Sequence, residues 1–126
     1  MLHERLECYR RLVELAEGFS KEGATWPRGY GYLSDQLKRA MASAVLNLAE
    51  GNARRNPADR RRFFEISRAS LVEVGACVDL SKAFGLTCHS KASQFKGEIH
   101  LISRMIFGLI RNEDNKMDNC ERRTAN

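Results

Sequence analysis

The sequence predicts an all-α protein, an antiparallel up-down four-helix bundle. Three observations support this fold class. Apolar residues recur at steps of three and four along four separate segments, which is the period of a helix with one buried face. Short segments rich in glycine or proline separate these stretches, so neighbouring helices should run antiparallel. The 126 residues match the size of a single domain, which argues against a two-domain enzyme.

The first helix is expected to begin at Leu2. Its apolar positions are Leu2, Leu6, Tyr9, Val13 and Ala16, separated by steps of four and three residues. The following stretch, Lys21 to Gly31, contains three glycines and the pair Trp26-Pro27. A residue that precedes proline is disfavoured in the α conformation, so this stretch predicts the first loop.

Two further helices follow the loop. The second should run from Leu33 or Ser34 to Gly51, because Leu37, Met41, Ala44 and Leu48 keep the helical spacing. The third should begin after Asn56, which can cap a helix N-terminus, with Pro57 at its first position. Its apolar face continues to Phe84, and Gly85 suits the residue just past a helix end.

The fourth helix is expected from Ser90 to Arg111. Phe95, Ile99, Ile102, Ile106 and Leu109 repeat the spacing of four and three. Residues 112–126 are almost all polar, and a segment that buries little apolar area does not offset the entropy of ordering. The sequence therefore predicts a bundle over residues 1–111 and a mobile polar tail over residues 112–126.

Composition restricts the class of protein. The net charge is +5, which favours a polyanionic partner. Charged residues interrupt the first twenty positions, and the apolar stretches are shorter than a membrane helix, so we expect a cytoplasmic protein that does not contact membranes. The four cysteines show no C-x-x-C spacing, so reduced thiols are expected, with no metal site. No nucleotide-binding, hydrolase or metalloprotease motif is present, so we expect no cofactor and no catalytic residues.

A polar stripe lies beside the apolar face of the second predicted helix. Its members on that helix fall four, three and four residues apart: they are Ser43, Asn47, Glu50 and Arg54. An antiparallel third helix would add Ser70 and Glu73 to this polar seam. The favoured interpretation is a structural network that fixes helix register. The alternatives are a ligand site, or an enzyme that uses Glu50 and Glu73 as a carboxylate pair.

The second and third predicted helices also carry a basic cluster. Between Glu50 and Ser70 there are six arginines against three acidic residues. Arginine forks onto phosphate oxygens, and the start of a helix adds N–H donors, so this segment suits a phosphate backbone. The alternative is a solvated charged face. The candidate nucleic-acid-binding residues are Lys38, Arg39, Arg54, Arg55, Arg60, Arg61, Arg62 and Arg68.

Aromatic rings that could stack on bases are scarce near these arginines. Trp26, Tyr30 and Tyr32, in the first loop, are the candidates for exposed rings. We therefore expect contact with the nucleic-acid backbone and little sequence preference. In the other interpretation, Trp26 anchors a contact between subunits.

The end of the second helix and the start of the third carry a recognisable pattern. The residues that match it in register are Arg39, Ala40, Ser43, Asn47, Ala49, Glu50, Gly51, Arg54, Arg62, Phe63, Ile66, Ser70 and Glu73. With these residues the chain resembles the four-helix-bundle family named for proteins encoded in intervening sequences of 23S ribosomal RNA genes, which is related to the accessory variability proteins of diversity-generating retroelements. The chain departs from the family pattern at Val45, Arg60 and Ala69.

The resemblance implies a homo-oligomer, often a five-membered ring, with a basic surface for nucleic acid or ribonucleoprotein and no established enzymatic activity. Combined with the arginine cluster, it predicts a non-catalytic adaptor that assembles with itself as a pentamer. The expected partners are RNA or DNA, with a reverse transcriptase or a ribosomal component as further candidates. The alternative function is a protein-binding scaffold with no nucleic-acid role.

Overall fold

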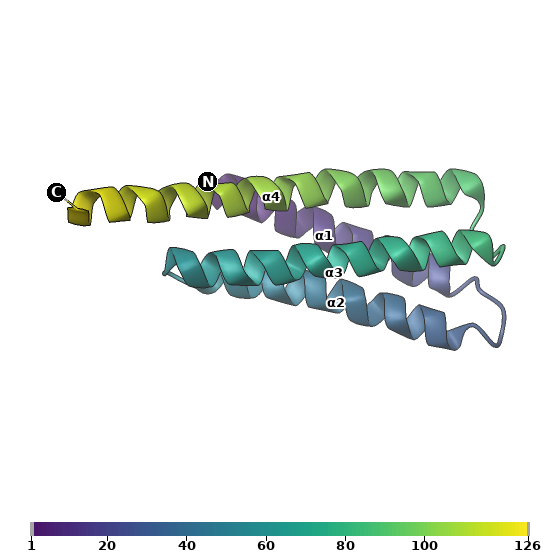
Figure 1. Ribbon diagram of the computed structural model, residues 1–126. Helices are drawn as coiled ribbons and strands as arrows, with labels where there is room; N and C mark the ends of the chain where they lie inside the picture. The colour runs from purple at the N-terminus through teal and green to yellow at the C-terminus, as the bar shows by residue number, and fades with distance from the viewer. Residues whose placement is uncertain (1, 126) are drawn as a thin grey trace.

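The protein is an antiparallel bundle of four helices. The computed structural model describes residues 2–125, which contain helices α1 (Leu2–Gly23), α2 (Gly31–Ala53), α3 (Pro57–Ala83) and α4 (His89–Ala125) and no strand. Each helix reverses the direction of the one before it, and α4 extends past the end where α2 passes to α3 (Figure 1). The predicted fold class is confirmed.

The helix boundaries correct the first predicted loop. Residues 21–23 belong to α1, so the loop is shorter than the stretch from Lys21 to Gly31 that its composition suggested. Gly29 adopts a φ of 102°, which glycine tolerates without a steric penalty. α2 then begins at Gly31, two residues before its first buried residue, Leu33.

The two ends of α3 follow the predicted signals. The side-chain oxygen of Asn56 accepts hydrogen bonds from the backbone N–H groups of Ala58 at 2.8 Å and Asp59 at 3.3 Å. Pro57 occupies the first turn, where a missing N–H costs nothing. At the other end, Gly85 has a φ of 73° and its N–H bonds to the Lys82 carbonyl. The predicted start and stop of this helix are confirmed.

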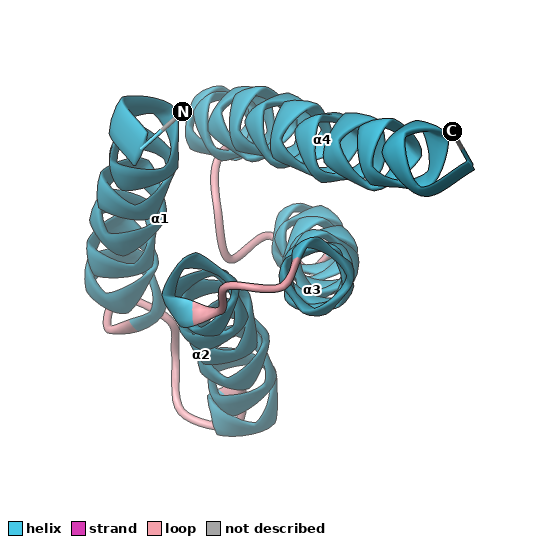
Figure 2. Cartoon of the chain, turned by 90° about the vertical axis from the view of Figure 1, so that its left-hand side faces the viewer, coloured by secondary structure: helices cyan, strands magenta, loops and turns pink. Residues whose placement is uncertain are grey.

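The core lies between the four helices, and α3 contributes the central side chains. Phe64 and Leu71 of α3 are 0% and 1% exposed, and they pack with Leu12, Leu48 and Ile102 from the other three helices. Viewed along the bundle, α3 neighbours α2 and α4, whereas α1 lies diagonally across from it (Figure 2). α1 is therefore held by α2 and α4 alone.

The predicted end of the fourth helix near Arg111 is wrong. α4 continues to Ala125, and Glu113 is 1% exposed. The polar composition of residues 112–126 gave no indication of this burial, because charged side chains are almost never fully buried unless a partner of opposite charge lies beside them. Most side chains after Glu113 are exposed, and the mobility of this segment stays a prediction.

The four cysteines are unpaired, with Cys8 and Cys77 buried and Cys88 and Cys120 exposed. Within residues 2–125, the helices lack the length and apolar character that crossing a bilayer requires.

The close approach of Phe64 to Gly51 predicts a stability effect at this glycine. A Cβ added there would lie 2.6 Å from a ring carbon of Phe64 and 3.3 Å from the Arg60 carbonyl oxygen. Gly51→Ala should therefore lower the free energy of unfolding by about 1–3 kcal/mol, although alanine favours helix. Gly97→Ala is the matched control, because a Cβ at that helical position meets nothing within 4 Å. It should raise stability by roughly 0.5–1 kcal/mol. Urea unfolding of both variants measures the contrast, and equal shifts would contradict the packing.

The burial of Cys8 and Cys77 and the exposure of Cys88 and Cys120 predict two slowly reacting and two rapidly reacting thiols. Burial raises the pKa of Cys8 to about 12, and it also raises the pKa of Cys77. Because the thiolate is the reactive form, a colorimetric thiol reagent at pH 8 should label Cys88 and Cys120 rapidly, and all four cysteines only in denaturant. The folded state holds the Cys8 proton more tightly than the unfolded chain, so stability should fall as pH rises from 9.0 towards about 12. Four fast thiols in the native protein would refute the buried placement.

Candidate functional site

The candidate site is the α2–α3 corner, the end of the bundle where residues 50–65 pass from one helix to the next. α2 ends at Ala53, and Arg54 takes an extended conformation with φ −80° and ψ 150°. Asn56 then occupies the N–H groups of Ala58 and Asp59. These two donors of the α3 N-terminus are consequently used by the protein itself, which differs from the expectation of free donors at this helix start.

A half-buried aromatic ring organises the outward arginines of the corner. The guanidinium carbon of Arg54 lies 5.0 Å from the ring centre of Phe63, and that of Arg62 lies 4.8 Å from it. Arg54 also pairs with Glu50 at 3.1 Å, with both side chains about half exposed. Cations stack on aromatic faces, so the ring holds two guanidinium groups together at the surface.

Two arginines of the corner carry unbalanced positive charge. Arg55 and Arg62 are exposed, and no acidic side chain among residues 2–125 forms a salt bridge with either. Arg62 rests on Phe63, which leaves its N–H groups free to donate in the plane of the guanidinium. This geometry suits bidentate contact with phosphate.

Arg60 points into the protein. Its side chain is 16% exposed and pairs with Glu113 of α4 at 3.4 Å, while its Nε donates to the Arg54 carbonyl at 2.8 Å. Arg5 of α1 approaches the same place and donates to the Asn52 carbonyl at 3.4 Å. Burial, and then the charge of Arg60, lower the pKa of Arg5, while Glu113 opposes the shift. Arg60 therefore closes the end of the bundle and is turned away from external ligands.

The buried Glu113 carboxylate joins two cations with unequal access to water. Its side chain is 2% exposed, and Lys116 lies 3.2 Å from the oxygen that also faces Arg60. The second carboxylate oxygen and the side-chain oxygen of Asn52 are buried without a hydrogen-bond partner.

The next two arginines of the cluster face α4. Arg61 pairs with Glu65 at 3.1 Å and with Asp114, so its charge is balanced twice. Arg68 stacks on Phe107 at 5.0 Å and donates to Ser103 at 3.3 Å. Arg68 is exposed and belongs to the α3–α4 face, apart from the arginines that surround Phe63.

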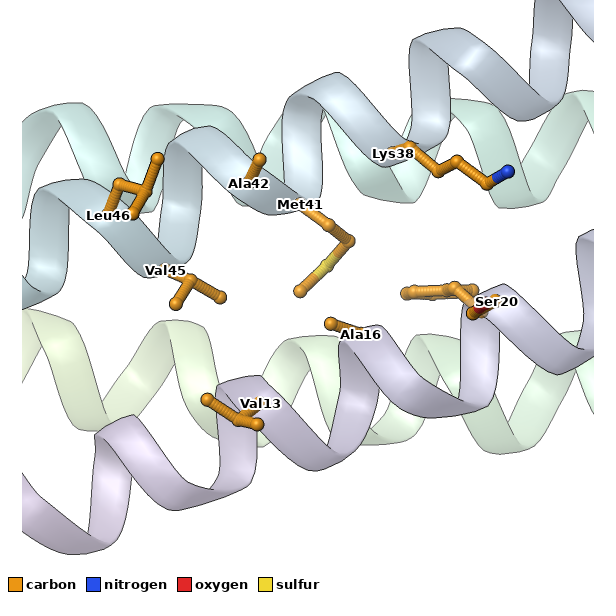
Figure 3. Close-up of a pocket in the computed structure, with 9 residues that line it drawn as sticks. Val13, Ala16, Ser20, Lys38, Met41, Ala42, Val45 and Leu46 are labelled. Atoms are coloured by element: carbon orange, nitrogen blue, oxygen red, sulfur yellow. The ribbon is translucent and has the colours of Figure 1, made fainter.

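Lys38 and Arg39 lie at a distance from the corner. Both are exposed, but they precede Arg54 by about four turns of α2, which is roughly 22 Å along the helix. Lys38 lines a groove between α1 and α2 together with Ser20 (Figure 3). The eight predicted arginines and lysines therefore do not form one continuous patch.

The polar seam divides into separate contacts. Ser43 and Ser70 share a hydrogen bond of 2.7 Å between α2 and α3, and Asn47 donates to the Ser43 carbonyl at 2.8 Å. Glu50 pairs with Arg54, whereas Glu73 accepts from Gln36 near the opposite end of α2. The six residues therefore do not form one connected network, and a structural role of the seam stays a prediction.

Glu50 and Glu73 do not form a carboxylate pair. Gln36 contacts Glu73 and precedes Glu50 by fourteen residues on α2, so the two carboxylates are roughly 20 Å apart. Residues 2–125 also contain no cluster of His, Cys, Asp and Glu suited to a metal ion. The enzyme alternative thus loses the pair on which it depended.

Sequence reasoning missed three residues that shape the site. Glu113, Arg5 and Asn52 lie together at the end of the bundle, and only Glu113 left a signal in the sequence. It follows Ile106 and Leu109 by seven and four residues, so it continues the buried face of the fourth helix by one turn. Its charge concealed that continuation.

Comparison with known proteins agrees with the resemblance noted in the sequence. The family model described as 23S rRNA-intervening sequence protein matches residues 4–108. A search of curated proteins finds no match.

The buried acid predicts a sharp contrast between two neighbouring carboxylates of α4. Glu113→Ala leaves Arg60 without a counter-charge inside the bundle, so it should lower the free energy of unfolding by about 3 kcal/mol. Asp114→Ala removes a partner of the 37% exposed Arg61, so it should cost less than about 1 kcal/mol. Urea denaturation followed by circular dichroism measures both. Similar losses for the two variants would show that Glu113 is not buried in solution.

Proposed function

Because the chain belongs to the 23S rRNA-intervening sequence protein family, we propose that it is a non-catalytic, homo-oligomeric adaptor that binds nucleic acid or ribonucleoprotein through the α2–α3 corner. The observation that supports this function most directly is the outward pair Arg55 and Arg62, which no carboxylate among the described residues neutralises. Arg54, shared with Glu50, adds a third guanidinium. Arg60 and Arg61 are not part of the proposed contact, because each forms a salt bridge with a carboxylate of α4.

The proposed contact is with the phosphate backbone. Arg54 and Arg62 stack on Phe63, and Arg68 stacks on the 44% exposed Phe107, so cations already lie against both rings. Trp26 packs against the core, and the exposed Tyr32 lies at the other end of the bundle. With few aromatic faces left for bases near the corner, affinity should depend on charge and carry little sequence preference.

Self-association completes the proposal, because one corner presents few cations. Each phosphate contact contributes a modest, salt-sensitive share of affinity. Copies that present the same corner side by side would multiply these contacts through effective concentration. The family resemblance favours a ring, and five copies are the number that it implies.

A protein-binding scaffold is the second candidate, and one observation favours it. α1 exposes a row of apolar side chains, Leu2, Leu6, Tyr9 and Val13, which are 61%, 55%, 38% and 41% exposed. Exposed apolar patches mark surfaces that bind other proteins. The same row also serves the self-association of the first proposal, so it does not separate the two functions by itself.

Salt dependence separates the two functions. Binding of structured RNA and duplex DNA is measured by gel shift at roughly 50 and 200 mM salt. Arg55→Ala combined with Arg62→Ala should reduce the log–log salt slope for duplex DNA by about 0.9 for each phosphate that the variant no longer neutralises. The control combines Arg28→Ala with Lys82→Ala, two exposed cations at the opposite end of the bundle, and should leave the slope unchanged. A flat slope for the unmodified protein, or no binding at low salt, would favour the scaffold.

A further inference from the structure

The space between α1 and α2 is an open, apolar groove. Val13 and Ala16 of α1 face Met41 and Val45 of α2 across it (Figure 3). The groove has a volume of about 350 Å³, and Lys38 and Ser20 stand at one end of it. Every residue that lines this groove belongs to α1 or α2, and α3 lies diagonally across the bundle from α1 (Figure 2).

The apolar surface extends beyond the groove on α1, where it continues as the row of Leu2, Leu6 and Tyr9. On α2 the lining of the groove includes Ala42 and Leu46, the latter 65% exposed. Such a face between two antiparallel helices has the shape that accepts one more helix. A helix that fits would carry small and apolar residues along one stripe.

The outer face of α3 carries such a stripe. Its exposed members are spaced three, four and four residues apart on the side opposite the core: they are Ala69, Val72, Ala76 and Leu80. Val72 is 71% exposed and Leu80 is 45% exposed. Alanines at two of the four positions allow another helix to approach closely, and Glu73 adjoins the stripe. The carboxylate of Glu73, which also accepts from Gln36 of its own chain, therefore has the charge opposite to that of Lys38 at the end of the α1–α2 groove.

Hydrogen bonds between α2 and α3 show which residues lie at the same height along the bundle. Ser43 meets Ser70, and the Ser67 hydroxyl donates to the Ala44 carbonyl at 2.6 Å. By this register Ala42 lies level with Ala69, and Lys38 lies level with Glu73. A rotation about an axis parallel to the bundle preserves height, so these levels would coincide between copies related by such a rotation.

We propose that the α1–α2 groove of each copy receives the outer face of α3 of the next copy, in a head-to-tail contact. This inference rests on the self-association in the proposed function and specifies its surfaces. Ala42 then faces Ala69 of the next copy, and Lys38 approaches Glu73 of the next copy. Because the two surfaces differ, the contact repeats from copy to copy, and a rotation about an axis parallel to the bundle closes it into a ring, whereas a two-fold dimer would pair identical surfaces.

Engineered cysteines test the contact directly. In a background with Cys88→Ser and Cys120→Ser, which removes the two exposed thiols, Ala42→Cys and Ala69→Cys are combined in one chain. Mild oxidation should produce a ladder of disulfide-linked species on a non-reducing gel, up to the copy number that native mass spectrometry gives. Disulfides form only when the two Cα atoms lie within about 7 Å, so the ladder reports a specific contact.

Matched controls separate this arrangement from others. Ala42→Cys alone and Ala69→Cys alone should each stay uncrosslinked, because neither position lies against the same position of another copy. Ala42→Cys with Ser93→Cys, on the exposed outer side of α4, should not form a ladder. A dimer from Ala42→Cys alone would indicate a two-fold contact through the groove and would overturn the head-to-tail arrangement.

Charge reversal provides a second, independent readout. Lys38→Glu and Glu73→Lys should each weaken association by roughly fivefold, the scale of an exposed ion pair, and the double variant should regain most of the loss. An oligomer that forms without the ladder and without this rescue would overturn the inference and leave self-association intact. A monomer in native mass spectrometry would overturn both. An intact ring that does not bind nucleic acid would count against the adaptor role alone.

Discussion

The ion pair between Arg60 and Glu113 is the interaction on which the geometry of the α2–α3 corner depends. It joins α3 to α4 where α2 passes into α3, and Arg5 of α1 and Asn52 of α2 meet at the same place. A carboxylate that is 2% exposed is stable only with a cation beside it. Arg60 supplies that cation, so the backbone at the start of α3 is fixed relative to α4, and the direction of every following arginine on α3 is fixed with it.

That constraint divides a run of three consecutive arginines into three environments. Successive residues on a helix point about 100° apart, so when Arg60 faces the core, Arg61 reaches Glu65 and Asp114, and Arg62 turns outward over Phe63. Acidic side chains of the same chain thus neutralise part of the positive charge in this run of arginines. Within the α2–α3 corner, the exposed guanidinium groups without a carboxylate partner are those of Arg55 and Arg62, and Arg54 is shared between Glu50 and the ring of Phe63.

Local signals predicted the four helices because each helix carries its own, although the apolar row Leu2, Leu6, Tyr9 and Val13 of α1 is exposed and the buried face is that of Cys8, Leu12, Leu15 and Phe19. The cap at Asn56, the stop at Gly85 and the spacing of Leu37, Met41 and Leu48 all depend on neighbours within one or two turns. The candidate site was harder to predict, because whether an arginine is paired depends on residues about fifty positions away, such as Glu113 and Asp114. The same limit explains the misplaced end of α4. The only local sign that Glu113 is buried is its helical spacing from Ile106 and Leu109, and its charge argues against burial until Arg60 is known to lie beside it.

The two proposals are linked by the direction in which the corners would point. A helix received by a groove between two antiparallel helices lies nearly along that groove, so copies in a head-to-tail ring would stand with their bundle axes close to parallel. The α2–α3 corner is at one end of the bundle (Figure 1), and every copy would then present its corner on the same rim. A few exposed guanidinium groups per chain would become a continuous belt of positive charge. Weak backbone contacts that a single copy could not sustain would then act together on one polyanion.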